Sequence, residues 1–216
     1  MPDAAREQAP TPERLLDAAE TLMSESGPDG VSIRAINAAA GCGPASVHYH
    51  FGSREELLEA VLVRRMDELA VRRGELLAEL EARSGPGRIR GLVEALVLPV
   101  AELIAREGEP GLRYVRLSAR LFADRSPLLA RLRETRFRDD FLRISQILQE
   151  LTPGVPRGAL GLRMEIAVHI ILHTLGDPRA LDPLAVAGPR GAAGCPSVSV
   201  LVDFVAAGLS AGGDGA

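Results

Sequence analysis

The chain has 216 residues, of which 46% are hydrophobic, and this is enough for a buried core in one or two domains. A net charge of −4 does not indicate a strongly basic nucleic-acid-binding chain, and two cysteines far apart, Cys42 and Cys195, do not indicate a disulfide framework. The sequence has no run of about 18 apolar residues and no secretory segment, so we expect a soluble cytoplasmic protein without membrane association.

Residues 1–10 are polar and contain proline, and we expect a flexible tail there. The first predicted helix has Thr11 as its N-cap and Pro12 in its first turn, and it ends at Gly27 or Gly30. Four apolar residues recur at helical spacing and form the buried stripe of this helix: Leu15, Ala19, Leu22 and Met23.

Residues 31–54 predict two helices joined by a tight turn. Ser32 is a good N-cap for the first helix, and Gly41 supplies the positive φ that ends it. The second helix is predicted over residues 44–50, with Pro44 in its first turn. At 1.5 Å per residue it is about 10 Å long and fits end-on into a major groove roughly 12 Å wide. The buried face of the first helix is formed by Ile33, Ile36 and Ala40.

The second helix has an apolar side and a polar side. Val47 and Phe51 are expected to point into the core, which leaves polar side chains outside, where they can bind bases or phosphates. No Asp or Glu occurs between residues 31 and 54. Two alternatives stay open, namely that Tyr49 is a core aromatic and that the histidines are merely solvated. The predicted DNA contacts are Arg34, Ser46, His48, Tyr49, His50 and Arg54.

From Ser53, which forms a capping box with Glu56, helical periodicity continues to the end of the chain, and no stretch predicts a strand. The fold class is therefore all-α with about nine helices, with a helix-turn-helix domain at 11–55 and a helical bundle at 56–216. Pro99 is expected to kink or break its helix. The predicted later helices cover residues 53–83, 88–107, 112–122, 126–151, 157–175 and 197–210, with an irregular stretch at 176–196.

Residues 13–62 resemble the N-terminal domain of the tetracycline-repressor (TetR) family of bacterial transcription regulators. The resemblance covers about a quarter of the chain, and it is strongest over AAAGCGPASVHYHFGSREELLEAV. Asn37, Cys42 and His48 depart from the family's usual Ala, Val and Tyr, so an operator sequence cannot be carried over. The family pattern is matched by Ile33 with Ile36, Ala40-Gly41, His48-Tyr49-His50-Phe51 and Ser53-Arg54-Glu55.

This resemblance implies a transcriptional repressor that binds palindromic operator DNA as a homodimer and is released by a small apolar or amphipathic effector. It also implies that the helices at 157–175 and 197–210 pair with those of a second subunit. No cofactor, metal or catalytic residue is expected. An apolar lining with a few polar groups is typical of an effector pocket. The candidate lining residues are Val97, Tyr114, Leu117, Leu121, Phe141, His169 and His173.

Other interpretations stay open at this stage. Glu165, His169 and His173 follow one another at four-residue spacing, so they share a helix face that either binds a metal, lines the effector pocket or is structural. Cys42 is expected to be a buried, inert thiol. No phosphate-binding loop and no nucleophile elbow is present, so we do not expect an enzyme. The alternative function is a helical small-molecule or metal-binding protein that has lost DNA binding.

Overall fold

The computed structural model describes residues 10–177 and 195–211, and within them it contains ten helices and no strand. The all-α prediction is confirmed. The expected tail and most of the irregular stretch at 176–196 lie outside the described residues. In chain order the helices are α2 (Thr11–Ser26), α3 (Ile33–Ala39), α4 (Ser46–Phe51), α5 (Arg54–Glu81), α6 (Arg88–Glu107), α7 (Glu109–Ala123), α8 (Pro127–Glu134), α9 (Arg138–Leu151), α10 (Arg157–Gly176) and α12 (Pro196–Ser210).

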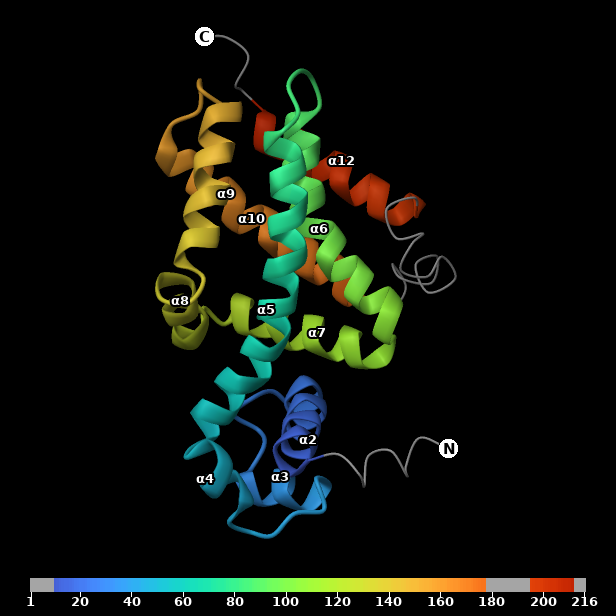
Figure 1. Ribbon diagram of the computed structural model, residues 1–216, viewed down its shortest axis with the longest axis vertical. Coiled ribbons are helices and arrows are strands. Elements are labelled where there is room, and N and C mark those ends of the chain that lie inside the picture. The colour runs from blue at the N-terminus through green and yellow to red at the C-terminus, as the bar shows by residue number, and fades with distance from the viewer. Residues whose placement is uncertain (1–9, 178–194, 212–216) are drawn as a thin grey trace.

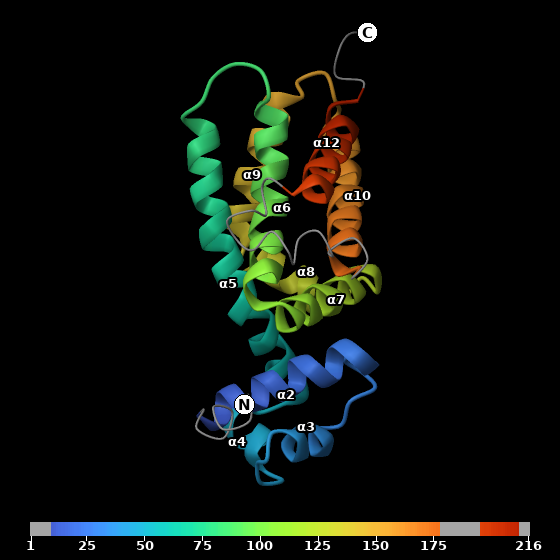
Figure 2. The ribbon, with the colours of Figure 1, turned by 90° about the vertical axis from the view of Figure 1, so that its right-hand side faces the viewer.

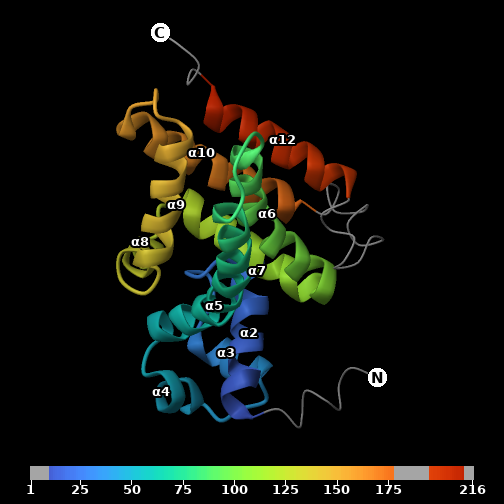
Figure 3. The ribbon, with the colours of Figure 1, turned by 45° about the horizontal axis from the view of Figure 1, so that its top comes forward.

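The molecule is elongated, with a small domain of α2, α3 and α4 at one end and a larger helical body at the other (Figure 1). Helix α5 begins in the small domain, next to α4, and runs into the body. Helix α7 lies across the base of the body and packs on α2. Helices α10 and α12 lie side by side along one flank (Figure 2), whereas α8 and α9 lie on the side away from α12 (Figure 3). The body therefore rests directly on the small domain.

A single cluster of buried apolar side chains runs through both parts, from Leu15 of α2 to Leu209 of α12. Where α2 meets α7, Gly27 ends α2 with a φ of 79°. This positive φ favours glycine, and a Cβ added at Gly27 would lie 2.5 Å from Cζ of Arg120 on α7, so the Arg120 guanidinium would also have to move. The expectation that α2 ends at a glycine is confirmed.

Helix α6 runs without interruption from Arg88 to Glu107 with Pro99 inside it, so the expected break is excluded, whereas a kink at Pro99 stays a prediction. A proline inside a helix removes one backbone hydrogen bond and costs about 3 kcal/mol. Pro99 and its neighbours are buried, and α6 packs against α5, α12 and α7. We infer that this packing outweighs the local cost, which periodicity arguments do not weigh.

Three predicted boundaries need correction. The single helix expected at 126–151 is two helices, α8 and α9, because the chain turns between them and buries the side chain of Phe137. Helix α7 starts at Glu109, with Pro110 in its first turn, where a loop was expected. Thr11 is the first residue of α2 instead of its cap, since Pro10 occupies the N-cap position.

Candidate nucleic-acid interface

Helix α3 forms as its sequence predicts. Ser32 has an extended backbone, and its side chain accepts a hydrogen bond from the Ala35 N–H at 3.1 Å. Ile36 is fully buried beneath the helix. Beyond Ala39 the chain reverses at Gly41, whose φ is 62°. Cys42 lies in this turn and is half-buried, whereas a buried thiol was expected. The turn fixes where the following helix begins.

Asn37 connects α3 to α4 through its side-chain amide. The amide donates a hydrogen bond from Nδ2 to the Pro44 carbonyl at 2.7 Å, and its Oδ1 accepts one from the Val47 N–H at 3.2 Å. The side chain is buried, with 2% exposed. The one sequence signal of this role is that Asn37 departs from the family pattern at its position. A buried amide with both polar ends satisfied holds the two helices in one fixed relation.

Helix α4 begins at Ser46, two residues later than predicted, because Pro44 and Ala45 form a turn before it. Val47 is fully buried and anchors the helix to the core. The opposite side is exposed, including Tyr49, whose side chain is 83% exposed. The interpretation of Tyr49 as a core aromatic is therefore wrong.

The exposed side chains of α4 lie close to one another. The Tyr49 and His50 rings pack edge to face with centroids 4.8 Å apart. Nδ1 of His48 lies 2.8 Å from the Gly52 carbonyl, a hydrogen bond that fixes the end of the helix. An open hollow of about 400 Å³ borders the start of α4 and is lined by Gly43, Pro44, Ala45, Ser46 and Tyr49.

The two predicted arginine contacts differ in their surroundings. Arg34 on α3 is exposed and forms no ion pair within the part of the chain that the structure describes. Arg54, at the start of α5, donates from one nitrogen to the carbonyls of Pro28 at 2.6 Å and Val31 at 3.3 Å, and from the other to Asp29 at 3.0 Å. Arg54 thus ties α5 to the loop before α3, and its contact with a phosphate stays a prediction.

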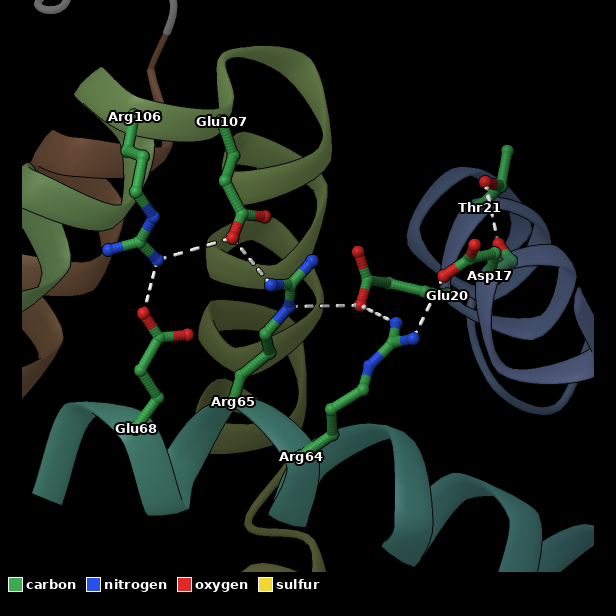
Figure 4. A network of polar contacts seen from close by, with 8 residues as sticks. All are labelled: Asp17, Glu20, Thr21, Arg64, Arg65, Glu68, Arg106 and Glu107. Atoms are coloured by element: carbon green, nitrogen blue, oxygen red, sulfur yellow. Dashed lines mark hydrogen bonds and ion pairs between the residues drawn. The ribbon is translucent and has the colours of Figure 1, made fainter. Parts of the chain in front are cut away.

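The Ser53 cap of α5 is present, since its hydroxyl accepts a hydrogen bond from the Glu56 N–H at 3.1 Å. Behind this end of α5, ion pairs join the small domain to the body (Figure 4). Their centre is Glu20 on α2, which is 3% exposed. No local sequence signal points to this role of Glu20, because its partners on α5 are more than forty positions away.

The predicted effector residues do not share one environment. Val97, Leu117 and Leu121 are buried in the body, and burial raises the pKa of Tyr114 to about 12. One turn from Tyr114, Oγ of Ser118 is buried, and its interaction with the Tyr114 hydroxyl offsets part of this rise in pKa. Phe141 is half-buried, whereas His169 and His173 are exposed on α10. The structure does not bring all seven together.

The rings of His169 and His173 are tilted by 35° to each other with centroids 4.5 Å apart, and the ring of Phe122 on α7 lies beside His169 at 5.9 Å. Glu165, one turn earlier, pairs with Arg125 at 3.9 Å. No group of three metal-ligating side chains occurs in residues 10–177 and 195–211.

A face of large apolar side chains is exposed on α10 and α12, and we call it the flank face. Four residues, each 50% to 67% exposed, form it: Leu162, Ile166, Val200 and Phe204. Helix α10 is also long and apolar enough, by length and composition alone, to cross a membrane, and 22% of that apolar window is buried in the chain itself; a single helix of this kind is weak evidence for a membrane span. Large exposed apolar side chains on two helices that pack against each other are typical of a contact surface.

Two family models match the chain. The one described as bacterial regulatory proteins, tetR family, matches residues 15–61, and the one described as tetracyclin repressor-like, C-terminal domain, matches residues 94–208. The HTH-type transcriptional regulator UidR of Escherichia coli (strain K12) is 31% identical over 72 residues, 33% of this chain and 37% of UidR. The HTH-type transcriptional repressor KstR2 of Rhodococcus jostii (strain RHA1) is 34% identical over 91 residues, 42% of this chain and 41% of KstR2. The matches thus span less than half the length of these curated relatives.

Solved structures share the whole fold. A transcriptional regulator from Rhodococcus sp. Rha1 is 25% identical with a TM-score of 0.53, covering 90% of this chain and 95% of its own. The regulator FadR from Bacillus subtilis, solved in complex with stearoyl-CoA, is 16% identical with a TM-score of 0.54, covering 93% of this chain and 98% of FadR. These likenesses extend the fold beyond the small domain to nearly the whole chain.

Proposed function

The chain belongs to the TetR family of bacterial regulatory proteins, and we propose that it is a ligand-responsive transcriptional repressor that binds palindromic operator DNA as a homodimer. The observation that carries this proposal is the outer side of α4, which presents exposed polar side chains from a segment without a single carboxylate. Although the whole chain has a net negative charge, a surface without carboxylates does not repel the phosphate backbone of DNA.

We propose that α4 enters the major groove and that different side chains of α4 contact the bases and the DNA backbone. Ser46, His48 and His50 face base edges or phosphates, and Tyr49 contacts the backbone. Arg34 is free to pair with a phosphate. Three contacts engage the Arg54 guanidinium, but its five N–H donors leave capacity for a phosphate as well.

The flank face supports the dimer. One six-residue helix makes too few base contacts for specificity, whereas two helices about 34 Å apart bind the half-sites of a palindrome. Packing of the flank face against a second copy would remove its apolar side chains from water. A bilayer is a poorer partner for α10, because Arg163, Glu165 and His169 lie within this helix and charged groups are costly in lipid. We therefore propose a cytoplasmic dimer without membrane contact.

We propose that the effector is a small apolar or amphipathic molecule bound within the body. The buried side chains of Val97, Leu117 and Leu121 offer apolar lining, and the Tyr114 and Ser118 hydroxyls offer polar groups. FadR, which shares the fold, was solved with an amphipathic molecule, stearoyl-CoA. An effector releases DNA only through its different affinity for the bound and free states of the protein, typically about 1 to 3 kcal/mol.

Selection of binding sites from a random pool of double-stranded DNA tests the proposal. We expect enrichment of a palindrome, and sedimentation analysis should find two chains on each selected duplex. A folded protein that enriches no sequence would contradict the proposal and would favour a helical ligand-binding protein that has lost DNA binding. Tyr49→Ala should weaken binding to every sequence about equally, whereas Leu142→Ala, which changes an exposed side chain on α9, should leave binding unchanged.

A further inference from the structure

Glu20 is the one charged side chain that is buried within the described residues, and it belongs to the DNA-binding domain. Its Oε2 accepts a hydrogen bond from Arg64 at 2.9 Å and lies 3.6 Å from Nε of Arg65. Both arginines are on α5. A buried carboxylate of α2 is thus neutralised by two consecutive residues of the helix that connects the domains.

The same arginines reach further on either side (Figure 4). Arg64 also binds Asp17 of α2 at 2.8 Å, and Arg65 binds Glu107, the last residue of α6, at 2.7 Å. Glu107 also forms an ion pair with Arg106, and Arg106 forms another with Glu68 of α5. We call this set the junction network: Asp17, Glu20, Arg64, Arg65, Glu68, Arg106 and Glu107.

The junction network connects α2 to α6 through a single helix. Consecutive residues of a helix point about 100° apart, so Arg64 is directed to α2 while Arg65 reaches both α2 and the end of α6. Burial alone would lower the pKa of Arg64, but its hydrogen bonds to Asp17 and Glu20 raise it, and the guanidinium stays charged. A movement of the end of α6 therefore acts on Arg65, and through it on the carboxylate of Glu20.

A pocket of about 380 Å³ lies beside the network, between the two domains. It gives these side chains room to change partners, and Arg113 on its wall has no ion pair within the described residues. The pocket is lined by Asp17, Glu20, Arg65, Glu107, Pro110 and Arg113.

We propose that the junction network positions the DNA-binding domain on the body and thereby sets the separation of the two α4 helices in the dimer. Glu20 and Arg65 are positioning residues, since they lie between α2, α5 and the end of α6 and would act on α4 only through the placement of the domain. The Glu107–Arg65 contact is the link at which a displacement of α6 reaches α2. This inference rests on the proposed function, because half-site spacing has meaning only for a dimer on a palindrome.

The test compares two alanine variants of the full-length protein. Glu107→Ala cuts the network at α6. Glu81→Ala is the matched control, because it removes an ion pair between α5 and α9, with Arg143, at the other end of α5. The selected palindrome is prepared with its natural centre and with one or two base pairs inserted or deleted between the half-sites. Dissociation constants are measured for each duplex, and Tm and sedimentation confirm that each variant is a folded dimer.

The wild-type protein and Glu81→Ala should lose at least about tenfold in affinity when the spacing changes, whereas Glu107→Ala should lose about threefold or less. A purely stabilising network would lower Tm but leave the preference for one spacing intact. If Glu107→Ala keeps the wild-type preference, the inference is wrong while the proposed function stands. If the folded wild-type protein binds no palindrome, the proposed function fails, and this inference fails with it.

Discussion

The contacts that hold the DNA-binding domain in shape differ in kind from the contacts that hold the body in shape. In α2–α4, individual polar groups fix the geometry, such as the Ser32 cap and the Asn37 amide that joins α3 to α4. In the body, α6 and α7 bury long rows of apolar side chains, among them the fully buried Leu117. We therefore expect that the loss of one hydrogen bond can disturb the geometry of the DNA-binding surface, whereas the stability of the body depends chiefly on buried side-chain volume.

The largest effect should come from the body. Leu117→Ala removes a fully buried side chain and should lower the free energy of unfolding by about 2 to 5 kcal/mol, from lost burial and a residual cavity. Urea denaturation measures the change. DNA affinity of the fraction that remains folded should be nearly unchanged. If Leu117→Ala lowered the DNA affinity of the folded protein as strongly as it lowers the free energy of unfolding, the contrast between the two regions would be wrong.

A smaller loss of stability, with a larger loss of function, is expected at the Asn37 amide. Asn37→Ala leaves the Pro44 carbonyl and the buried Val47 N–H without a partner, at a cost of about 1 to 3 kcal/mol. Operator affinity should fall with it, because α4 loses its fixed angle to α3. The matched comparison is Thr152→Ala, which removes a buried polar side chain in the body and should leave DNA binding intact.

Tyr49→Ala should change binding without changing stability. The side chain is 83% exposed, so Tm should stay within error, while affinity for all sequences should fall about tenfold, or about 1.4 kcal/mol. Ser46→Ala and His48→Ala should instead alter base preference. Titrations against a panel of operator variants separate the two outcomes. A drop in Tm for Tyr49→Ala would place its ring in the folded core after all.

The smallest effect should come from the Glu81–Arg143 pair. Its hydrogen bonds lower the pKa of Glu81 from the ordinary value of 4.5, so the pair stabilises the fold above that pH and stops doing so as the pH falls through the lowered pKa. The pair is partly exposed and screened, so Glu81→Gln should cost roughly 0 to 1 kcal/mol at neutral pH and nothing in acid. Thermal denaturation at neutral and acidic pH measures the difference. A large loss would disqualify this pair as a control for the junction network.

Local signals predicted the DNA-binding domain well. The Ser32 and Ser53 caps and the Gly41 turn each depend on neighbours a few residues away, and the structure contains all three. Asn37 and Glu20 were not predicted, because their partners are fixed only by the tertiary fold. The start of α4 was predicted two residues early for the same reason, since Asn37 holds the turn that precedes it.

In the body, periodicity predicted the helices but misplaced their breaks. Pro99 stays inside α6 because packing on several sides outweighs a lost backbone bond, and the α8–α9 corner forms because burying Phe137 needs a turn that periodicity does not contain. Leu162 and Ile166 of α10 are exposed apolar residues, and the pairing of this helix with a second subunit stays a prediction. The effector site stays a prediction, because apolar lining residues look the same as core residues in a sequence.

The central claim, that α4 and its surroundings form a DNA-binding surface, is tested most directly by a salt series. The dissociation constant of the purified protein for its selected duplex is measured by fluorescence anisotropy at increasing salt concentration. Each neutralised phosphate should contribute about 0.9 to the slope of log affinity against log salt, so the account predicts a steep slope of several units. A flat salt dependence, or no measurable binding by the folded protein, would contradict the claim.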